Sequence, residues 1–201
     1  MKYSEINESK SRSVIVVDVQ PEYSGMLDGA ENPVMEEIIE FVNNQTGKVL
    51  MFVNAEQSGM SGDSISDVQL YWEESGFDPK NWSRVTIVDK GYGYFRSWMD
   101  QGISESIIIK VIRLLYQHRV NDSRDIFDSN PDLLKEIAGY EFEEWMLEEG
   151  ITVEWTSVKQ LKDFSGSYIV GGARDQCLRE VELLMNAFNI KYKRIDSLVY
   201  D

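Results

Sequence analysis

The sequence predicts an α/β fold: a three-layer α/β/α sandwich on a mostly parallel sheet of five or six strands, with a helical insertion. Two observations predict it. Short, continuous runs of apolar and β-branched residues recur along the chain, as in strands that are buried on both faces of a parallel sheet. Segments with apolar residues at helical spacing separate most of these runs, and strands that alternate with helices form parallel sheets with right-handed crossovers.

The order of the elements follows from these runs and their boundaries. The predicted strands are residues 13–18, 48–53, 85–88, 168–171 and 192–199. The predicted helices are residues 33–42, 67–74, 104–115 and the segment from 176 onward. Pro33 and Ser104 suit the first positions of two of these helices, and the Gly- and Ser-rich residues 55–66 are predicted to form a loop.

The connection before the fourth strand is long for this fold class. We interpret residues 119–165 as an insertion in a single domain that spans residues 1–201, with a helix over 131–147 and a short edge strand over 151–155. The insertion holds too many aromatic residues for a free solvated loop, so we expect it to narrow the pocket and to form a homodimer interface. His118 is expected only to end the preceding helix.

Composition restricts what the protein can bind. The chain of 201 residues suits one large α/β domain, and its 35 acidic and 20 basic residues give a formal net charge of −15. Nucleic acid and anionic membranes would need a basic face, so neither is an expected partner. The single cysteine fits a reducing compartment, and no apolar stretch approaches the ~20 residues that span a membrane. With its polar N-terminal segment, the protein is expected to be cytoplasmic.

The cysteine lies where a strand has turned and a helix begins. Gly171 and Gly172 break the apolar run of the fourth strand, and apolar residues recur at helical spacing after Cys177. A thiol there is exposed to the positive end of the helix dipole, which favours the thiolate. Free N–H groups of the turn can receive an oxyanion. The alternative is a buried cysteine that acts as a small hydrophobic residue.

Two further polar residues are predicted at the same edge of the sheet. Asp18 ends the first strand and Lys90 follows the third, and ligands of open parallel sheets bind beyond the carboxyl ends of the strands. A buried carboxylate is costly unless paired, and Lys90 can pair it. With Cys177 these groups suit acyl chemistry, in which the carboxylate accepts the thiol proton and the thiolate attacks carbon. The alternative is a structural ion pair beside an inert thiol.

Three motifs of the chain resemble those of one enzyme family. Val16–Gln20 is an apolar strand that runs into Asp-x-Gln, and Lys90 is followed five positions later by the aromatic Phe95. Gly171 precedes Cys177 by six residues, with Asp175 where the family often has Asp. In this order the motifs resemble the isochorismatase-like cysteine hydrolases, which include nicotinamidases and N-carbamoylsarcosine amidases.

The resemblance implies a catalytic triad and an oxyanion hole. Asp18 is the implied general base, Lys90 its electrostatic partner and Cys177 the nucleophile. A cis peptide bond between Gly172 and Ala173 is implied as well, with the N–H groups of Ala173 and Cys177 forming the hole. The family commonly pairs its subunits, which also favours a homodimer.

Residues near these motifs are candidates for the substrate pocket. They are Gln20, Tyr23, Phe95, Arg124 and Arg174. Arg124 suits a substrate carboxylate.

The chain departs from the family in its metal-binding stretch. Nicotinamidases of this family hold a divalent metal through an Asp and histidines after the second strand, whereas residues 54–59 here include no histidine. We therefore expect no metal, no cofactor and a substrate other than nicotinamide. Val181 and Lys191 also replace residues that are typical of the family.

Two functions remain open from the sequence. The leading one is a metal-independent cysteine hydrolase that cleaves a small amide or related C–N bond through a thioester on Cys177. The alternative is a non-catalytic scaffold that binds a protein partner through the insertion. Alkylation of Cys177 well below pH 8.5, the ordinary cysteine value, would favour the hydrolase.

Overall fold

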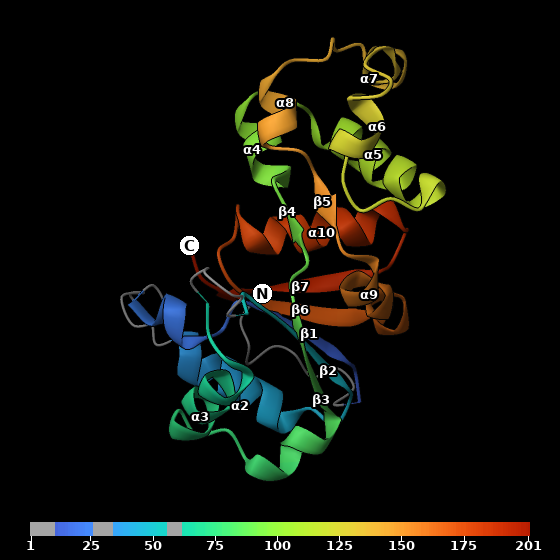
Figure 1. Cartoon of the computed structure of the whole chain (residues 1–201). Coiled ribbons are helices and arrows are strands. Elements are labelled where there is room, and N and C mark those ends of the chain that lie inside the picture. The colour runs from blue at the N-terminus through green and yellow to red at the C-terminus, as the bar shows by residue number, and fades with distance from the viewer. Residues whose placement is uncertain (1–10, 26–33, 56–61) are drawn as a thin grey trace. The chain divides into compact units, whose positions relative to one another are not determined.

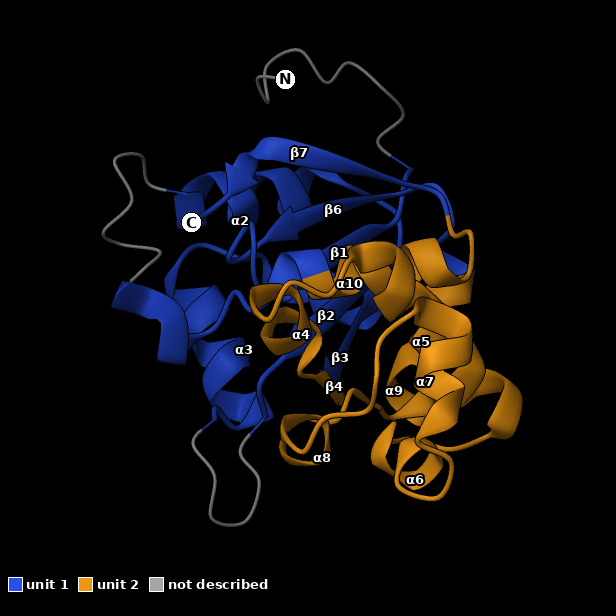
Figure 2. Cartoon of the chain, turned by 90° about the horizontal axis from the view of Figure 1, so that it is seen from above, with its two compact units in different colours: residues 1–90, 163–179, 191–201 blue, residues 91–162, 180–190 orange. Residues whose placement is uncertain are grey.

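The chain forms two compact units, shown in Figure 2. The computed structural model describes residues 11–25, 34–55 and 62–201. The first unit consists of residues 1–90, 163–179 and 191–201, and the second of residues 91–162 and 180–190. The parallel sheet belongs to the first unit, and the second is mainly helical.

The described part of the first unit is built on a five-stranded, all-parallel sheet with the order β3-β2-β1-β6-β7 (Figure 1). Its strands are β1 (Val14–Val17), β2 (Val49–Val53), β3 (Val85–Asp89), β6 (Ser167–Gly171) and β7 (Tyr192–Val199). In the centre of the sheet, Val14 pairs with Val49 on one side and with Tyr168 on the other. The predicted α/β class is therefore confirmed.

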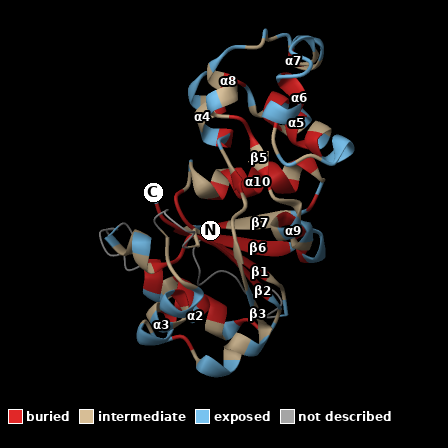
Figure 3. Ribbon diagram, viewed as in Figure 1, coloured by how far each residue is buried: buried red, intermediate tan, exposed pale blue. Residues whose placement is uncertain are grey.

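The central strands are buried on both faces. Successive residues of a strand point to opposite faces, and every residue of β1, β2 and β6 is buried (Figure 3). This burial explains the unbroken apolar runs in the sequence, because apolar and polar residues would alternate along a strand with one face exposed to solvent. A sheet covered on both faces is consistent with the predicted three-layer sandwich.

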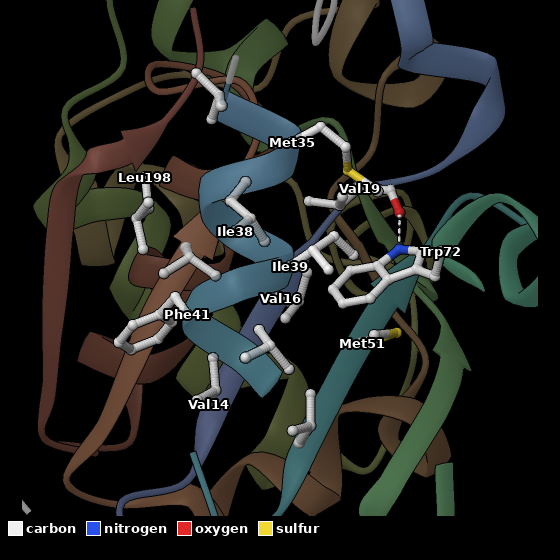
Figure 4. Packing of buried hydrophobic residues seen from close by; sticks show 14 of the residues in the cluster. Val14, Val16, Val19, Met35, Ile38, Ile39, Phe41, Met51, Trp72 and Leu198 are labelled. Carbon is white, nitrogen blue, oxygen red and sulfur yellow. Dashed lines mark hydrogen bonds between the residues drawn. The ribbon is translucent and has the colours of Figure 1, made fainter. Parts of the chain in front are cut away.

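One face of the sheet is covered by helix α2 (Val34–Asn44), as Figure 4 shows. The helix presents an apolar stripe to the strands; its buried residues are Val34, Met35, Ile38, Ile39, Phe41 and Val42. Burial of each of the larger side chains contributes roughly 1.5–3 kcal/mol. Trp72 of helix α3 (Ile65–Glu74) joins this core, and its indole N–H donates to the backbone carbonyl of Val19 at 2.8 Å.

Short 3₁₀ helices complete the first unit. They are η2 (Pro21–Tyr23) and η3 (Pro79–Arg84). The predicted loop over residues 55–66 ends in α3, and Ala55 and Asp63 form an isolated parallel bridge. Residues 56–61 of that loop, Pro33 and the N-terminal residues 1–10 lie outside the described residues.

The second unit is an assembly of short helices around a two-stranded antiparallel sheet. Its elements are β4 (Tyr92–Gly93), α4 (Phe95–Asp100), α5 (Glu105–His118), α6 (Arg124–Phe127), α7 (Asp132–Ala138), α8 (Trp145–Glu148), β5 (Thr152–Val153) and α9 (Trp155–Val158). Helix η4 (Lys159–Phe164) and helix α10 (Cys177–Ala187) have residues in both units. Helix α5 ends at His118, as predicted.

The second unit contains most of the predicted insertion, residues 119–162, and the interpretation of 119–165 as an insertion in a single domain stays a prediction. The structure corrects two other predictions for this region. The helix predicted over 131–147 is two helices, since Gly139 ends α7 with a φ of 78°. The predicted edge strand is β5, which pairs with β4 and bridges Asp122 through Thr152, and does not join the five-stranded sheet.

Several aromatic residues of this region pack against one another within the second unit. The ring of Trp98 lies 6.4 Å from that of Phe127 and 5.8 Å from that of Trp145, measured between centroids. Phe127 and Met146 are buried. Among the described residues, no helix is long and apolar enough to cross a membrane.

We predict that Trp72→Phe lowers the free energy of unfolding by about 2–4 kcal/mol, because the buried carbonyl of Val19 loses its donor and the smaller ring leaves a void. The matched control is Trp82→Phe, whose indole N–H donates to the exposed carboxylate of Glu73 and whose loss should cost under about 1 kcal/mol. Urea titration followed by circular dichroism measures both. Equal losses in the two variants would contradict this prediction.

Candidate active site

Asp18, Lys90 and Cys177 lie together at the carboxyl edge of the parallel sheet. The ammonium of Lys90 forms an ion pair with Oδ2 of Asp18, and its Nζ lies 3.0 Å from Sγ of Cys177. The thiol and the carboxylate of Asp18 are close enough for each to shift the pKa of the other. The structure thus brings together the three side chains that the sequence predicted at this edge.

Each of the three residues directly follows a strand or begins a helix. Asp18 follows β1 and Lys90 follows β3, and their backbone N–H groups continue the sheet by donating to the carbonyls of Phe52 at 2.9 Å and Val53 at 3.0 Å. Cys177 is the first residue of α10. Asp18 has a φ of 52°, in the left-handed region where Asp is one of the few tolerated residue types.

The ion pair is almost completely removed from water. The side chain of Asp18 is 1% exposed and that of Lys90 is 14% exposed. Burial raises the pKa of Asp18 above its ordinary value, and Lys90 opposes this only in part. Burial alone would lower the pKa of Lys90, but the charges of Asp18 and Cys177 outweigh it and hold the pKa above its usual range. Lys90 therefore stays an ammonium.

The thiol is protonated in the resting site. Burial, and after it the charge of Asp18, raise the pKa of Cys177 to about 12, and Lys90 offsets only part of this. The sequence prediction that the helix N-terminus favours a thiolate is wrong for this state. Desolvation and a neighbouring carboxylate both disfavour a second negative charge, and together they exceed the effect of the dipole.

The turn that leads to Cys177 contains backbone N–H groups that have no acceptor among the described residues. The N–H of Gly172 donates to the carbonyl of Val17 at 2.8 Å, and the N–H of Arg174 donates to that of Tyr200 at 2.9 Å. Within the described part of the chain, the N–H groups of Ala173 and Cys177 donate to no acceptor. These are the two amides that the family resemblance implied as an oxyanion hole.

The implied cis peptide bond is not found. The described residues contain no cis peptide bond, so Gly172 and Ala173 are joined in trans. A cis bond before a non-proline residue costs about 3–4 kcal/mol, and the chain turns here by another means. Gly171 adopts a φ of 103°, which a side chain would not permit, because a Cβ would lie 2.3 Å from the carbonyl oxygen of Val17.

Of the predicted pocket residues in the first unit, only Tyr23 is tied electrostatically to the triad. Burial and the charge of Asp18 raise the pKa of its half-buried hydroxyl to about 12. Arg174 instead forms ion pairs with Asp201 at 2.8 Å and Asp196 at 3.4 Å. Its guanidinium thus anchors the segment after β7.

Gln20 is buried, and both ends of its amide are engaged. Its Oε1 accepts from the N–H of Asn54 at 2.7 Å, and its Nε2 donates to the carbonyl of Asn54 at 3.0 Å and to Oδ2 of Asp63 at 2.7 Å. The side chain therefore links the exits of β1 and β2. Gln20 is therefore not among the proposed substrate contacts.

The remaining two predicted pocket residues belong to the second unit. Phe95 is buried at the start of α4, with its ring centroid 6.0 Å from that of Tyr92 in a stacked arrangement. Arg124 is exposed, and its Nε donates to Oδ2 of Asp122 at 2.8 Å. Its guanidinium thus already has a carboxylate partner.

Sequence reasoning missed Tyr200. This buried residue follows β7, and its hydroxyl donates to the backbone carbonyl of Asp18 at 2.7 Å. A buried tyrosine hydroxyl needs a partner, but no spacing rule connects positions 182 residues apart. Only the sheet order, which separates β7 from β1 by a single strand, brings them together.

The described residues contain no cluster of three or more His, Cys, Asp or Glu side chains that could hold a metal ion. Residues 56–61, part of the stretch where the resembled family binds its metal, lie outside this description. The metal-free chemistry inferred from the sequence stays a prediction.

Comparisons of the chain with protein-family models, curated proteins and solved structures found no match. The resemblance to the isochorismatase-like hydrolases thus stays a prediction from the three motifs.

We predict that Gly172→Ala lowers the free energy of unfolding by about 3 kcal/mol or more. A Cβ at this position would lie 1.6 Å from Cζ of Tyr200, whose buried and hydrogen-bonded ring has little room to move. Gly25→Ala is the control, because a Cβ there meets nothing within 4 Å, and its effect should stay within about 0.5 kcal/mol. Thermal melts compare the two; a Gly172→Ala variant as stable as the control would refute the close packing.

We predict that Asp18→Asn makes Cys177 more reactive toward iodoacetamide. The carboxylate raises the pKa of the thiol, so removing its charge lowers that pKa while Lys90 remains. A decrease of one pKa unit raises the thiolate fraction at pH 8 about tenfold. Mass spectrometry measures the rate at the chain's single cysteine.

Asp63→Asn is the matched control for this experiment. Asp63 lies at the same edge of the sheet but is bound by Gln20 and the N–H of Glu22. Its variant should be alkylated at close to the wild-type rate. An Asp18→Asn variant that reacts more slowly than the wild type would contradict the assigned coupling.

Proposed function

We propose that the protein is a metal-independent cysteine hydrolase that cleaves a small amide or a related C–N bond, with Cys177 as the nucleophile. The observation that carries this proposal is the position of the thiol: it contacts a buried Asp18–Lys90 ion pair, and its residue begins a helix where the N–H groups of Ala173 and Cys177 have no acceptor among the described residues. An inert structural cysteine needs none of these neighbours. The proposal agrees with the resemblance to the isochorismatase-like hydrolases.

In the acylation step, Asp18 acts as the general base. It accepts the proton of the Cys177 thiol, to which it is electrostatically coupled, and the sulfur forms a bond to the substrate carbonyl carbon. The negative charge that develops on the carbonyl oxygen is stabilised by the N–H groups of Ala173 and Cys177. The C–N bond then breaks, and the departing nitrogen takes the proton from Asp18, which leaves a thioester.

In the second step, water completes the reaction. Asp18 accepts a proton from the water, whose oxygen attacks the thioester carbon, and the same two amides stabilise the oxyanion. The C–S bond breaks, the sulfur regains the proton from Asp18, and the carboxylic acid leaves. No oxidant, reductant or metal ion is needed for this balance.

The electrostatics of the site suit these proton transfers. Burial raises the pKa of Asp18, which makes the carboxylate a stronger base than an exposed one. Lys90 donates to both reacting groups and therefore stabilises whichever of them carries the negative charge. Attack and proton transfer are thus expected to occur together, because a free thiolate beside Asp18 would be costly.

The protonated resting thiol changes how the two functions can be separated. The sequence suggested alkylation well below pH 8.5 as the sign of a hydrolase. Because the pKa of Cys177 is raised, such alkylation is expected neither of the hydrolase nor of the scaffold. The scaffold alternative has less support, because Phe127 and Trp145 of the predicted insertion pack against Trp98 within the second unit. The small-molecule substrate, the homodimer and the cytoplasmic location inferred from the sequence belong to the same proposal.

We predict that the protein hydrolyses at least one member of a panel of small primary amides and N-carbamoyl compounds, and that Cys177→Ala abolishes this turnover. Loss of a covalent nucleophile commonly removes a factor of about 10⁴ or more. The protein is first treated with a chelator and then incubated with each compound, and the acid product and the released ammonia or amine are measured. Asp18→Asn should also be inactive even though its thiol is more reactive.

The two outcomes that would contradict the proposal are distinct. Turnover that survives in Cys177→Ala would assign the reaction to another group. Turnover that is lost with the chelator and restored by a divalent metal would assign it to metal chemistry. An acyl adduct on Cys177 in the wild type, detected by mass spectrometry after acid quenching, identifies the thioester directly.

A further inference from the structure

Tyr200 joins the two halves of the proposed catalytic machinery. The residue directly follows β7 and is 3% exposed. Its hydroxyl donates to the backbone carbonyl of Asp18 at 2.7 Å, in a bond that is buried. Its own carbonyl accepts from the N–H of Arg174 at 2.9 Å, in the turn that leads to Cys177. One residue therefore contacts both the segment of the base and the segment of the nucleophile.

The backbone of Asp18 is in a conformation that needs outside support. Its φ of 52° lies in the left-handed region, which is disfavoured for a residue with a side chain. Its N–H donates to Phe52 and its carbonyl accepts from Tyr200, so both backbone groups are occupied by neighbouring elements. Without the hydroxyl, a buried carbonyl would lack its partner, and the residue could relax toward the β region.

The ring of Tyr200 also fixes the nucleophile turn. It occupies the space where a side chain at position 172 would stand, since a Cβ there would lie 1.6 Å from Cζ of the ring. The backbone of Gly172 is held on its other side by the bond to Val17. The turn that carries the free amides is thus packed between β1 and the tyrosine ring.

We propose that Tyr200 is a positioning residue, which holds the Asp18 carboxylate against the Cys177 thiol and the Lys90 ammonium. This inference rests on the proposed function for the meaning of that geometry. The hydroxyl is suited to a permanent donor, because burial and the nearby charges of Asp18 and Cys177 raise its pKa far above the ordinary value. It therefore donates across the whole range of pH in which the protein would work.

If the role of Tyr200 were purely structural, loss of another buried donor to the same segment would have the same effect on Cys177. The chain offers a matched comparison. Trp72 donates to the carbonyl of Val19, the residue after Asp18, through an equally buried side chain-to-backbone bond of 2.8 Å. Both bonds support the same segment, but only Tyr200 contacts the residue that carries the carboxylate. Tyr200→Phe and Trp72→Phe each remove one donor and keep an aromatic ring.

The experiment is the pH dependence of iodoacetamide alkylation at Cys177 in the full chain, measured by mass spectrometry. Because Asp18 raises the pKa of the thiol, displacement of its carboxylate shifts the profile to lower pH. We expect Tyr200→Phe to react about tenfold faster than the wild type at pH 8, the effect of one pKa unit. Trp72→Phe should keep the wild-type profile despite its lower stability.

A rescue variant separates the effect of the hydrogen-bond donor from that of the aromatic ring. Replacement of the tyrosine at position 200 by 4-aminophenylalanine keeps a neutral donor at the same place and should restore the wild-type profile. It also serves if the phenylalanine variant does not fold. A Tyr200→Phe profile that is unchanged or shifted to higher pH would overturn the proposal. So would a Trp72→Phe shift equal to that of Tyr200→Phe, or a rescue variant that shifts the profile by the full tenfold.

The readout does not depend on turnover. If no amide is hydrolysed but Tyr200→Phe shifts the alkylation profile, the positioning inference stands and the proposed reaction fails. If amides are hydrolysed through Cys177 but the profile does not move, the reaction stands and the role of Tyr200 fails.

Discussion

The buried ion pair between Asp18 and Lys90 is the interaction on which the carboxyl edge of the sheet depends. A carboxylate that is 1% exposed is tolerable only beside a cation, and removing one partner of such a pair commonly costs about 3–5 kcal/mol. The pair joins the exits of β1 and β3, which are separated in the sheet by β2. Replacing both partners of a buried pair by well-packed apolar residues is often neutral for stability, so stability alone does not account for the charges, and the proposed function gives them a role.

Burial and the same ion pair together determine the state of the thiol. Burial is the largest cause of the raised pKa of Cys177, the charge of Asp18 adds to it, and Lys90 offsets only part of both, so the proton stays on sulfur. In the proposed mechanism, a protonated thiol stays unreactive toward stray electrophiles until a carbonyl is in place. This differs from cysteine enzymes whose thiolate is formed in advance by a helix dipole or an imidazolium.

The parallel sheet could be predicted from the sequence because its strands are buried on both faces. An unbroken apolar run such as Val14–Val17 is typical of a strand inside a parallel sheet, and the polar residues that follow such runs must lie at the carboxyl edge. The second unit was harder to predict, because several of its helices have only four to seven residues and are too short to show a clear helical spacing of apolar residues. Tyr200 and the raised pKa of Cys177 depend on burial and on contacts across the chain, which no local pattern records.

The bond between Tyr200 and Asp18 spans 182 positions and has a consequence for how the protein is made. At the 5–20 residues per second of synthesis, β1 waits on the order of ten seconds or more before the segment after β7 exists. In that interval β1 can pair with β2, its near neighbour in sequence, while its other partner β6 is still absent. The left-handed backbone at Asp18 therefore gains its support among the last contacts to form. A nascent chain carries Asp18 and Lys90 well before the segment after β7 exists, so the proposed site is held in place only when the fold is complete.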